Sequence, residues 1–145
     1  MPRIHREAIV PYSCAQMFAL VNDVERYPQF LAGCTAAEIL TQSEASMRAR
    51  LTLSKAAFRQ AFVTENHWIA ERRIDMKLAE GPFKHLHGQW QFMPLGDACK
   101  VVVTIDFEFA SMLGSIAFGA AFQRLVASLM DSFIQRAKVV YADGR

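Results

Sequence analysis

The stretch SMLGSIAFGAAFQRLVASLMDSFIQRAKVV, residues 111–140, decides the fold class of this chain. Its apolar residues recur at steps of three and four, which is the spacing of one face of an α-helix. They are Met112, Ile116, Gly119, Phe122, Val126, Leu129, Phe133, Ala137 and Val140. The pattern predicts one long helix that begins at Ser111 and ends before Asp143 and Gly144.

The first half of this helix is apolar on more than one side. Between Met112 and Val126, the only long polar side chains are Gln123 and Arg124. A helix that is apolar all round must be buried, paired with a partner, or in contact with lipid or ligand. We therefore expect this half of the helix to face a cavity or an interface as well as a sheet.

Upstream of the helix, the hydrophobic period changes to two. Residues 47–53, 73–78, 86–92 and 103–109 alternate between apolar and polar side chains. This alternation is typical of antiparallel strands with one buried and one solvated face. Segments 35–42 and 57–67 are also expected to be strands, although their alternation is irregular.

The first thirty residues predict one strand and one or two short helices. Residues 3–10 read as a strand that Pro11 ends. Ser13 and Gln16 have the spacing of a capping box, so a helix should begin there and end near Asn22. A second, very short helix should end at Tyr27-Pro28, because the residue before a proline avoids helical dihedral angles.

The element order predicts one α+β domain over residues 1–145. Its antiparallel sheet of about seven strands would curve around the C-terminal helix, so that the two apolar faces bury each other.

Composition excludes several functional classes. The 145 residues are 52% hydrophobic and 21% charged, which excludes a disordered chain, and the net charge of +2 is far from that of a dedicated nucleic-acid binder. Three widely spaced cysteines suggest neither a disulfide framework nor a zinc site. With no apolar signal region and no apolar run of about 20 residues, a protein of a reducing, cytoplasmic compartment is expected.

Several strings resemble the coenzyme Q-binding START-domain family, also called polyketide cyclase-like, and the resemblance covers nearly the whole chain. They are Val10-Pro11-Tyr12-Ser13, Val21-Asn22-Asp23-Val24, Tyr27-Pro28-Gln29-Phe30-Leu31 with Gly33-Cys34, Gly81-Pro82-Phe83, Gly88-x-Trp90-x-Phe92-x-Pro94, Asp106-Phe107-Glu108-Phe109, Ala117-Phe118-Gly119-x-x-Phe122 and Arg136-Ala137-Lys138-x-Val140-Tyr141. Within that family, the likeness is strongest to the bacterial ribosome association toxins.

The resemblance implies a helix-grip (START-like) fold and two roles. One role is binding of ubiquinone or a similar isoprenoid lipid, as a non-covalent ligand, in support of respiration. The other is binding of the large ribosomal subunit, which blocks subunit association. A cyclase-like enzyme is a third reading. The same fold hosts many functions, so the likeness alone does not separate these roles. We favour a non-enzymatic, hydrophobic-ligand-binding protein.

Nine apolar side chains are the candidates for a ligand cavity, because ligand pockets are mostly apolar with few polar groups. The mouth and the helix side comprise Phe30, Leu31, Phe83, Phe118, Phe122 and Val126, and the sheet wall comprises Trp90, Phe92 and Phe107. The alternative is an ordinary filled core, in which aromatic rings supply most of the buried area.

The same end of the molecule suggests contact with a larger partner. A loop that carries Tyr27, Phe30 and Leu31 beside the apolar start of the helix would suit the inner membrane surface. A homodimer interface through the apolar helix end is the alternative.

Basic residues gather in the middle of the chain. Residues 48–87 hold eight Lys and Arg against four Asp and Glu. Arg48, Arg50, Arg73 and Lys77 occupy the polar positions of predicted strands, where they would form a basic outer face for ribosomal RNA phosphates. A solvated sheet face is the alternative.

No catalytic or metal site is expected. His85 and His87 would share one face of a strand, but a third ligand is not evident from spacing. Cys34 has no obvious basic partner that would activate its thiol.

Overall fold

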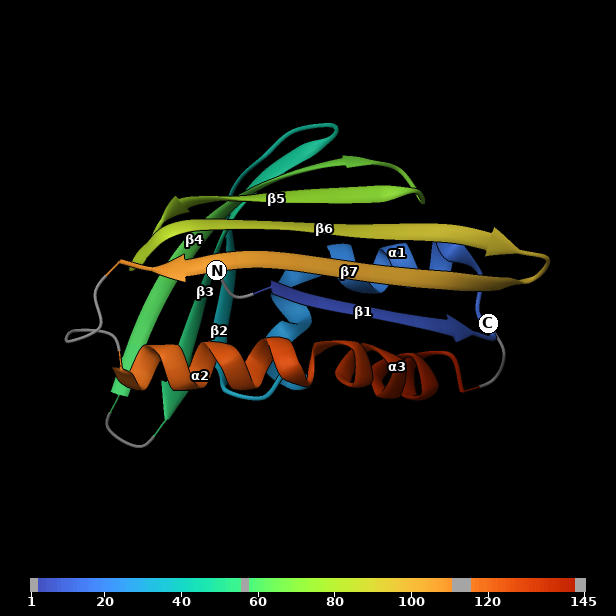
Figure 1. Cartoon of the computed structure of the whole chain (residues 1–145). Helices are drawn as coiled ribbons and strands as arrows, with labels where there is room; N and C mark the ends of the chain where they lie inside the picture. The colour runs from blue at the N-terminus through green and yellow to red at the C-terminus, as the bar shows by residue number, and fades with distance from the viewer. Residues whose placement is uncertain (1–2, 56–57, 111–115, 143–145) are drawn as a thin grey trace.

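A seven-stranded antiparallel sheet curls around two C-terminal helices in the computed structural model, which describes residues 3–55, 58–110 and 116–142 (Figure 1). The elements are β1 (Arg3–Val10), α1 (Cys14–Asn22), the 3₁₀-helix η1 (Val24–Gln29), β2 (Cys34–Gln42), β3 (Ser46–Lys55), β4 (Phe58–Ile69), β5 (Arg73–Glu80), β6 (Phe83–Leu95), β7 (Ala98–Phe109), α2 (Ile116–Ala127) and α3 (Leu129–Val140). This confirms the α+β, helix-grip prediction.

The strands lie in the order β1-β7-β6-β5-β4-β3-β2, and every neighbouring pair is antiparallel. Strands β2 to β7 therefore form a meander, and β1 joins its far edge beside β7. The predicted alternation places Met47, Trp90 and Phe107 inside, and each is at most 2% exposed. The helices lie along the same concave side of the sheet (Figure 1).

The C-terminal helix is divided, which corrects the prediction of one continuous helix. α2 ends at Ala127 and α3 begins at Leu129. Between them, the Ser128 hydroxyl donates hydrogen bonds to the carbonyls of Arg124, at 3.0 Å, and Leu125, at 3.3 Å. Such back-bonding by serine competes with the regular helical ladder and bends helices. The first residues of the predicted helix, 111–115, lie outside the described residues.

The first helix follows its prediction, whereas the second does not. Ser13 and Gln16 form the expected capping box, and α1 ends at Asn22. η1 continues through Pro28 to Gln29, so Pro28 does not end it. A proline removes one backbone donor, and in a single short 3₁₀ segment little regular structure depends on that donor.

Candidate ligand-binding cavity

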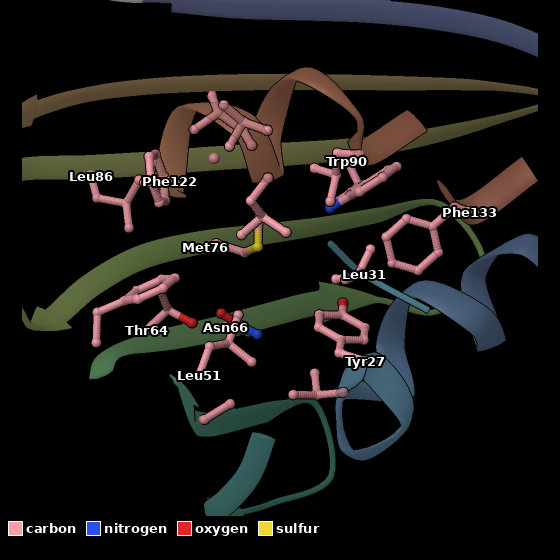
Figure 2. Close-up of a pocket in the computed structure, with 18 residues that line it drawn as sticks. Tyr27, Leu31, Leu51, Thr64, Asn66, Met76, Leu86, Trp90, Phe122 and Phe133 are labelled. Atoms are coloured by element: carbon pink, nitrogen blue, oxygen red, sulfur yellow. The ribbon is translucent and has the colours of Figure 1, made fainter. Parts of the chain in front are cut away.

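A cavity of about 70 Å³ lies between the concave face of the sheet, η1 and the two C-terminal helices (Figure 2). Strands β3 to β7 form its wall, and the helices close the opposite side. Its lining consists of Val24, Tyr27, Leu31, Ala49, Leu51, Phe62, Thr64, Asn66, Met76, Leu86, Gly88, Trp90, Ile105, Phe122, Leu125, Val126, Leu129 and Phe133.

The size of the cavity limits what it holds without rearrangement. An engineered apolar cavity of about 150 Å³ accepts benzene, and drug-sized ligands occupy about 300–1,000 Å³. At about 70 Å³, this cavity must widen before a quinone-sized ring enters. The Met76 side chain is the most adaptable part of the wall, because its thioether chain has three rotatable bonds.

Three polar side chains interrupt the apolar lining: those of Tyr27, Thr64 and Asn66. The Tyr27 hydroxyl donates to the Val21 carbonyl, and burial raises the pKa of Tyr27 well above its usual value, so the phenol stays neutral. Thr64 and Asn66 occupy alternate positions of β4 and are 8% and 5% exposed. Asn66 Oδ1 is buried and has no hydrogen-bond partner within the described residues.

Four of the nine side chains that the sequence suggested line the cavity. They are Leu31, Trp90, Phe122 and Val126, and each is at most 5% exposed. Figure 2 shows Trp90 and Phe122 on opposite sides of Met76. Contact of these residues with a ligand stays a prediction.

Three of the other five pack into an aromatic cluster beside the cavity and not in its lining. Phe83, Phe107 and Phe118 are buried but do not line the cavity. The Phe122 ring lies 4.9 Å from both Phe83 and Phe107, and Phe83 lies 5.4 Å from Phe118. These edge-to-face contacts fill the space beside the cavity as a core does.

The remaining two also lie outside the lining. Phe92 is on the predicted inward face of β6, but it packs between Trp90, at 6.3 Å, and Phe18 of α1, at 5.8 Å. Phe30 is half-buried, with its ring centre 5.1 Å from that of Phe133, and the Arg136 guanidinium carbon lies over the Phe30 ring, 5.1 Å from its centre.

Sequence reasoning missed several lining residues. Leu129 and Phe133 lie on the same helical stripe as Phe122 and Val126, so this stripe was the signal for them. The irregular alternation of β4 was the signal for Thr64 and Asn66, because polar residues there share the face of the buried Phe62.

The side chains expected to meet a membrane or a second copy are turned inward. In the predicted contact loop, Tyr27 and Leu31 are buried and Phe30 is half-buried. In the described part of α2, Phe118 and Leu125 are buried, and Ile116 is the large apolar side chain left exposed, at 73%. The curved sheet thus covers most of the apolar excess that suggested an exposed patch.

The predicted basic outer face is largely neutralised by carboxylates. Arg48 lies 3.3 Å from Glu65, and Arg73 lies 3.0 Å from Asp75. Arg50 pairs with Glu38. Lys77 has no carboxylate within 4 Å among the described residues, so of the four predicted cations it is the one without an ion pair.

The sheet register explains this balance, because it places opposite charges on neighbouring strands. One cross-strand row reads Arg48, Glu65, Lys77, His87, Asp106 and Arg3 from β3 to β1. Opposite charges at directly paired positions favour the sheet modestly. A phosphate that approaches this row would compete with its carboxylates.

Other chemistry on the described residues is limited. Burial raises the pKa of the Cys34 thiol to about 11 and that of Cys99 to about 12, so both stay protonated and unreactive near neutral pH. No group of three metal-ligating side chains gathers in residues 3–55, 58–110 and 116–142. None of the helices described is both long enough and apolar enough to cross a bilayer.

Comparison with curated proteins finds relatives of two kinds. The chain is 47% identical over 143 residues to the persistence and stress-resistance toxin PasT of Escherichia coli O6:H1, and 46% identical to the ribosome association toxin RatA of E. coli K12. Both alignments cover 98% of this chain and 90% of the relative. The coenzyme Q-binding protein COQ10 homolog B of Xenopus laevis is 26% identical and covers 92% of this chain and 57% of that protein.

Solved structures share the fold at low identity. The Zhui aromatase/cyclase of Streptomyces sp. R1128 superposes with a TM-score of 0.79 at 16% identity and covers 95% of both chains. A START superfamily protein of Mycobacterium smegmatis gives 0.75 at 20% identity and covers 95% of this chain and 98% of its own. The family model described as polyketide cyclase / dehydrase and lipid transport matches residues 10–134. With this match and the toxin relatives aligned over nearly its whole length, the chain belongs to the polyketide cyclase / dehydrase and lipid transport family.

Proposed function

We propose that this chain binds a hydrophobic ligand of the isoprenoid quinone class, with ubiquinone as the first candidate. The observation that carries the proposal is the cavity, whose wall is apolar apart from Tyr27, Thr64 and Asn66. An apolar enclosure with a few polar groups suits a ring that carries oxygen atoms and an isoprenoid tail. The name of the coenzyme Q-binding relative supports this ligand class.

Binding without catalysis is part of the proposal. A general acid or base works best with a pKa near the working pH, and it must reach the reacting atom. The ionisable group of the lining is Tyr27, and its raised pKa keeps the phenol protonated near neutral pH, so it is not available as a general base. The aromatase/cyclase likeness, at 16% identity, supports the fold and not the reaction.

The ligand class also implies where the protein works. Isoprenoid quinones dissolve in bilayers and hardly in water, because each buried CH₂ group contributes about 0.8 kcal/mol to transfer out of water. We propose a cytoplasmic protein that meets the inner membrane surface transiently to take up or release its ligand.

Ligand extraction tests this function directly. Protein purified from its own cells without detergent is expected to yield, after organic extraction and mass spectrometry, close to one quinone or isoprenoid lipid per chain. An unrelated protein purified in parallel measures the background. Absence of such a molecule, together with no binding of added short-tail ubiquinone, would contradict the proposal.

Ribosome association is a second candidate function, and a different observation favours it. The relative named ribosome association toxin is 46% identical over 98% of this chain. We propose that a surface of the folded domain contacts the large ribosomal subunit and hinders subunit joining. The two roles do not exclude each other, because the cavity lies between the concave face of the sheet and the helices, whereas a ribosome would contact the outer surface.

Overexpression followed by sucrose-gradient sedimentation tests the second role. The expected result is a smaller 70S peak, larger 50S and 30S peaks, and co-sedimentation of the protein with 50S particles that weakens as salt rises. Lys77→Glu should weaken co-sedimentation if the outer face of the sheet makes the contact, and Lys138→Glu on α3 is the matched charge reversal elsewhere. Unchanged peaks and no co-sedimentation at low salt would eliminate the role.

A further inference from the structure

Asn66 is a buried polar residue in an apolar wall. It is 5% exposed, and its Oδ1 has no hydrogen-bond partner within the described residues. Buried polar atoms nearly always have a partner, because burial removes the hydrogen bonds that water would supply. A native residue that departs from this rule at the wall of a cavity therefore marks a place where a partner arrives from outside the chain.

The position of Asn66 excludes the usual structural explanations. It lies inside β4, where its cross-strand neighbours are Met47 of β3 and Met76 of β5, and neither offers a strong hydrogen bond. Figure 2 shows its amide group pointing into the cavity, beneath Met76 and beside Thr64. The amide thus neither caps a helix nor cross-links two strands.

The unpartnered atom indicates the chemistry of the missing group. A carboxamide oxygen only accepts hydrogen bonds, so its partner must be a donor such as a hydroxyl. Along the same sheet wall, β6 contributes the Trp90 indole, whose ring centre lies 5.2 Å from the Phe133 ring of α3, and these two aromatic groups favour an aromatic ligand. Together these groups fit a phenolic ring better than a saturated hydrocarbon.

We propose that Asn66 Oδ1 accepts a hydrogen bond from a hydroxyl of the bound ligand, so that the cavity prefers a quinol or another phenolic isoprenoid over its fully oxidised or oxygen-free counterpart. The proposal rests on the ligand-binding function proposed above and adds the oxidation state of the head group. Thr64, two residues away on the same face, is placed beside the same end of the ligand.

Calorimetric titration with three probes of equal tail length tests the proposal: decyl-ubiquinol, kept reduced under argon, decyl-ubiquinone and decylbenzene. Each is titrated into the wild type, Asn66→Leu and Thr52→Val. Leucine has the same branched skeleton and the same number of side-chain heavy atoms as asparagine, but it offers no acceptor. Thr52→Val is the matched control, because Thr52 is a buried polar residue of neighbouring β3 that does not line the cavity.

The wild type should bind the quinol about tenfold more tightly than the quinone or the alkylbenzene. Asn66→Leu should remove this preference and leave the affinity for decylbenzene unchanged, and Thr52→Val should preserve the preference. Urea denaturation without ligand adds a second readout. A structural asparagine would leave the variant less stable, whereas an unpaired one should leave the urea midpoint unchanged or raised.

The outcomes separate the two proposals. Equal binding of all three probes, a preference for the quinone, or an Asn66→Leu variant that keeps the quinol preference would each overturn the role of Asn66 and leave ligand binding standing. If none of the probes binds the wild type, the proposed ligand-binding function fails, and the role of Asn66 fails with it.

Discussion

Replacing Phe122 by alanine is expected to lower the free energy of unfolding by about 3–5 kcal/mol, the usual range for removal of a buried phenylalanine ring. Phe122 is 2% exposed, and its ring centre lies 4.9 Å from Phe83 and Phe107 and 5.7 Å from Phe62. These partners come from β6, β7 and β4, so one side chain joins α2 to three strands. Urea denaturation followed by circular dichroism measures the change.

Ile116→Ala provides the matched control for this variant. It removes an apolar side chain from the same helix, but Ile116 is 73% exposed and its loss should change stability by less than about 0.5 kcal/mol. A loss below about 1 kcal/mol for Phe122→Ala would show that the aromatic cluster does not hold α2 against the sheet. That result would contradict the packing described here.

The prediction of the fold succeeded where one physical signal dominates. Alternation in β3, β5, β6 and β7 is regular because one face packs on the helices and the other meets water. The break at Ser128 was not predicted, because serine is compatible with a helix interior. Its hydrogen bonds to Arg124 and Leu125 become visible only in three dimensions.

The cavity was harder to predict, because burial and cavity lining give the same apolar signal. Trp90 and Phe107 both occupy inward strand positions and are both buried, yet the cavity lies against one and not the other. Which inward side chains meet a void depends on how the sheet curves and how α2 and α3 pack. Asn66 could have been predicted as a lining residue, because it shares the buried face of β4 with Phe62. A buried polar side chain at such a position needs a hydrogen-bond partner.

The ion pairs of the basic face were hard to predict for a related reason. Counting charges along residues 48–87 ignores the strand that lies beside each cation. The register places Glu65 opposite Arg48, and Glu38 opposite Arg50. Sequence separation hides these partners, because Glu38 belongs to a strand outside the counted segment.

Replacing Gly88 by alanine is expected to weaken quinol or quinone binding at least tenfold, a loss of about 1.4 kcal/mol. Gly88 belongs to the cavity wall, and a Cβ atom built on it would lie 2.6 Å from Met76 Cε. Its other neighbours, Ile105 Cγ1 at 3.5 Å and the Thr104 carbonyl at 3.7 Å, would tolerate the methyl group. The strain is therefore relieved by moving Met76, and the added methyl group occupies volume that a ligand needs.

A second substitution distinguishes this steric effect from general damage. In Gly88→Ala/Met76→Ala, the clashing atom is gone and the space returns, so affinity should recover to within a few fold of the wild type. Gly88→Ala alone should lower the free energy of unfolding by about 1–3 kcal/mol through overpacking.

Met76→Ala alone should bind the ligand at least as tightly as the wild type, because it widens a cavity of only about 70 Å³. If Gly88→Ala binds normally, or if the double variant does not recover, the ligand does not occupy this cavity. The coupling energy is the difference between the affinity change of the double variant and the sum of the changes of the two single variants. A large coupling energy would show that the ligand occupies the cavity beside Gly88 and Met76 and widens it on binding.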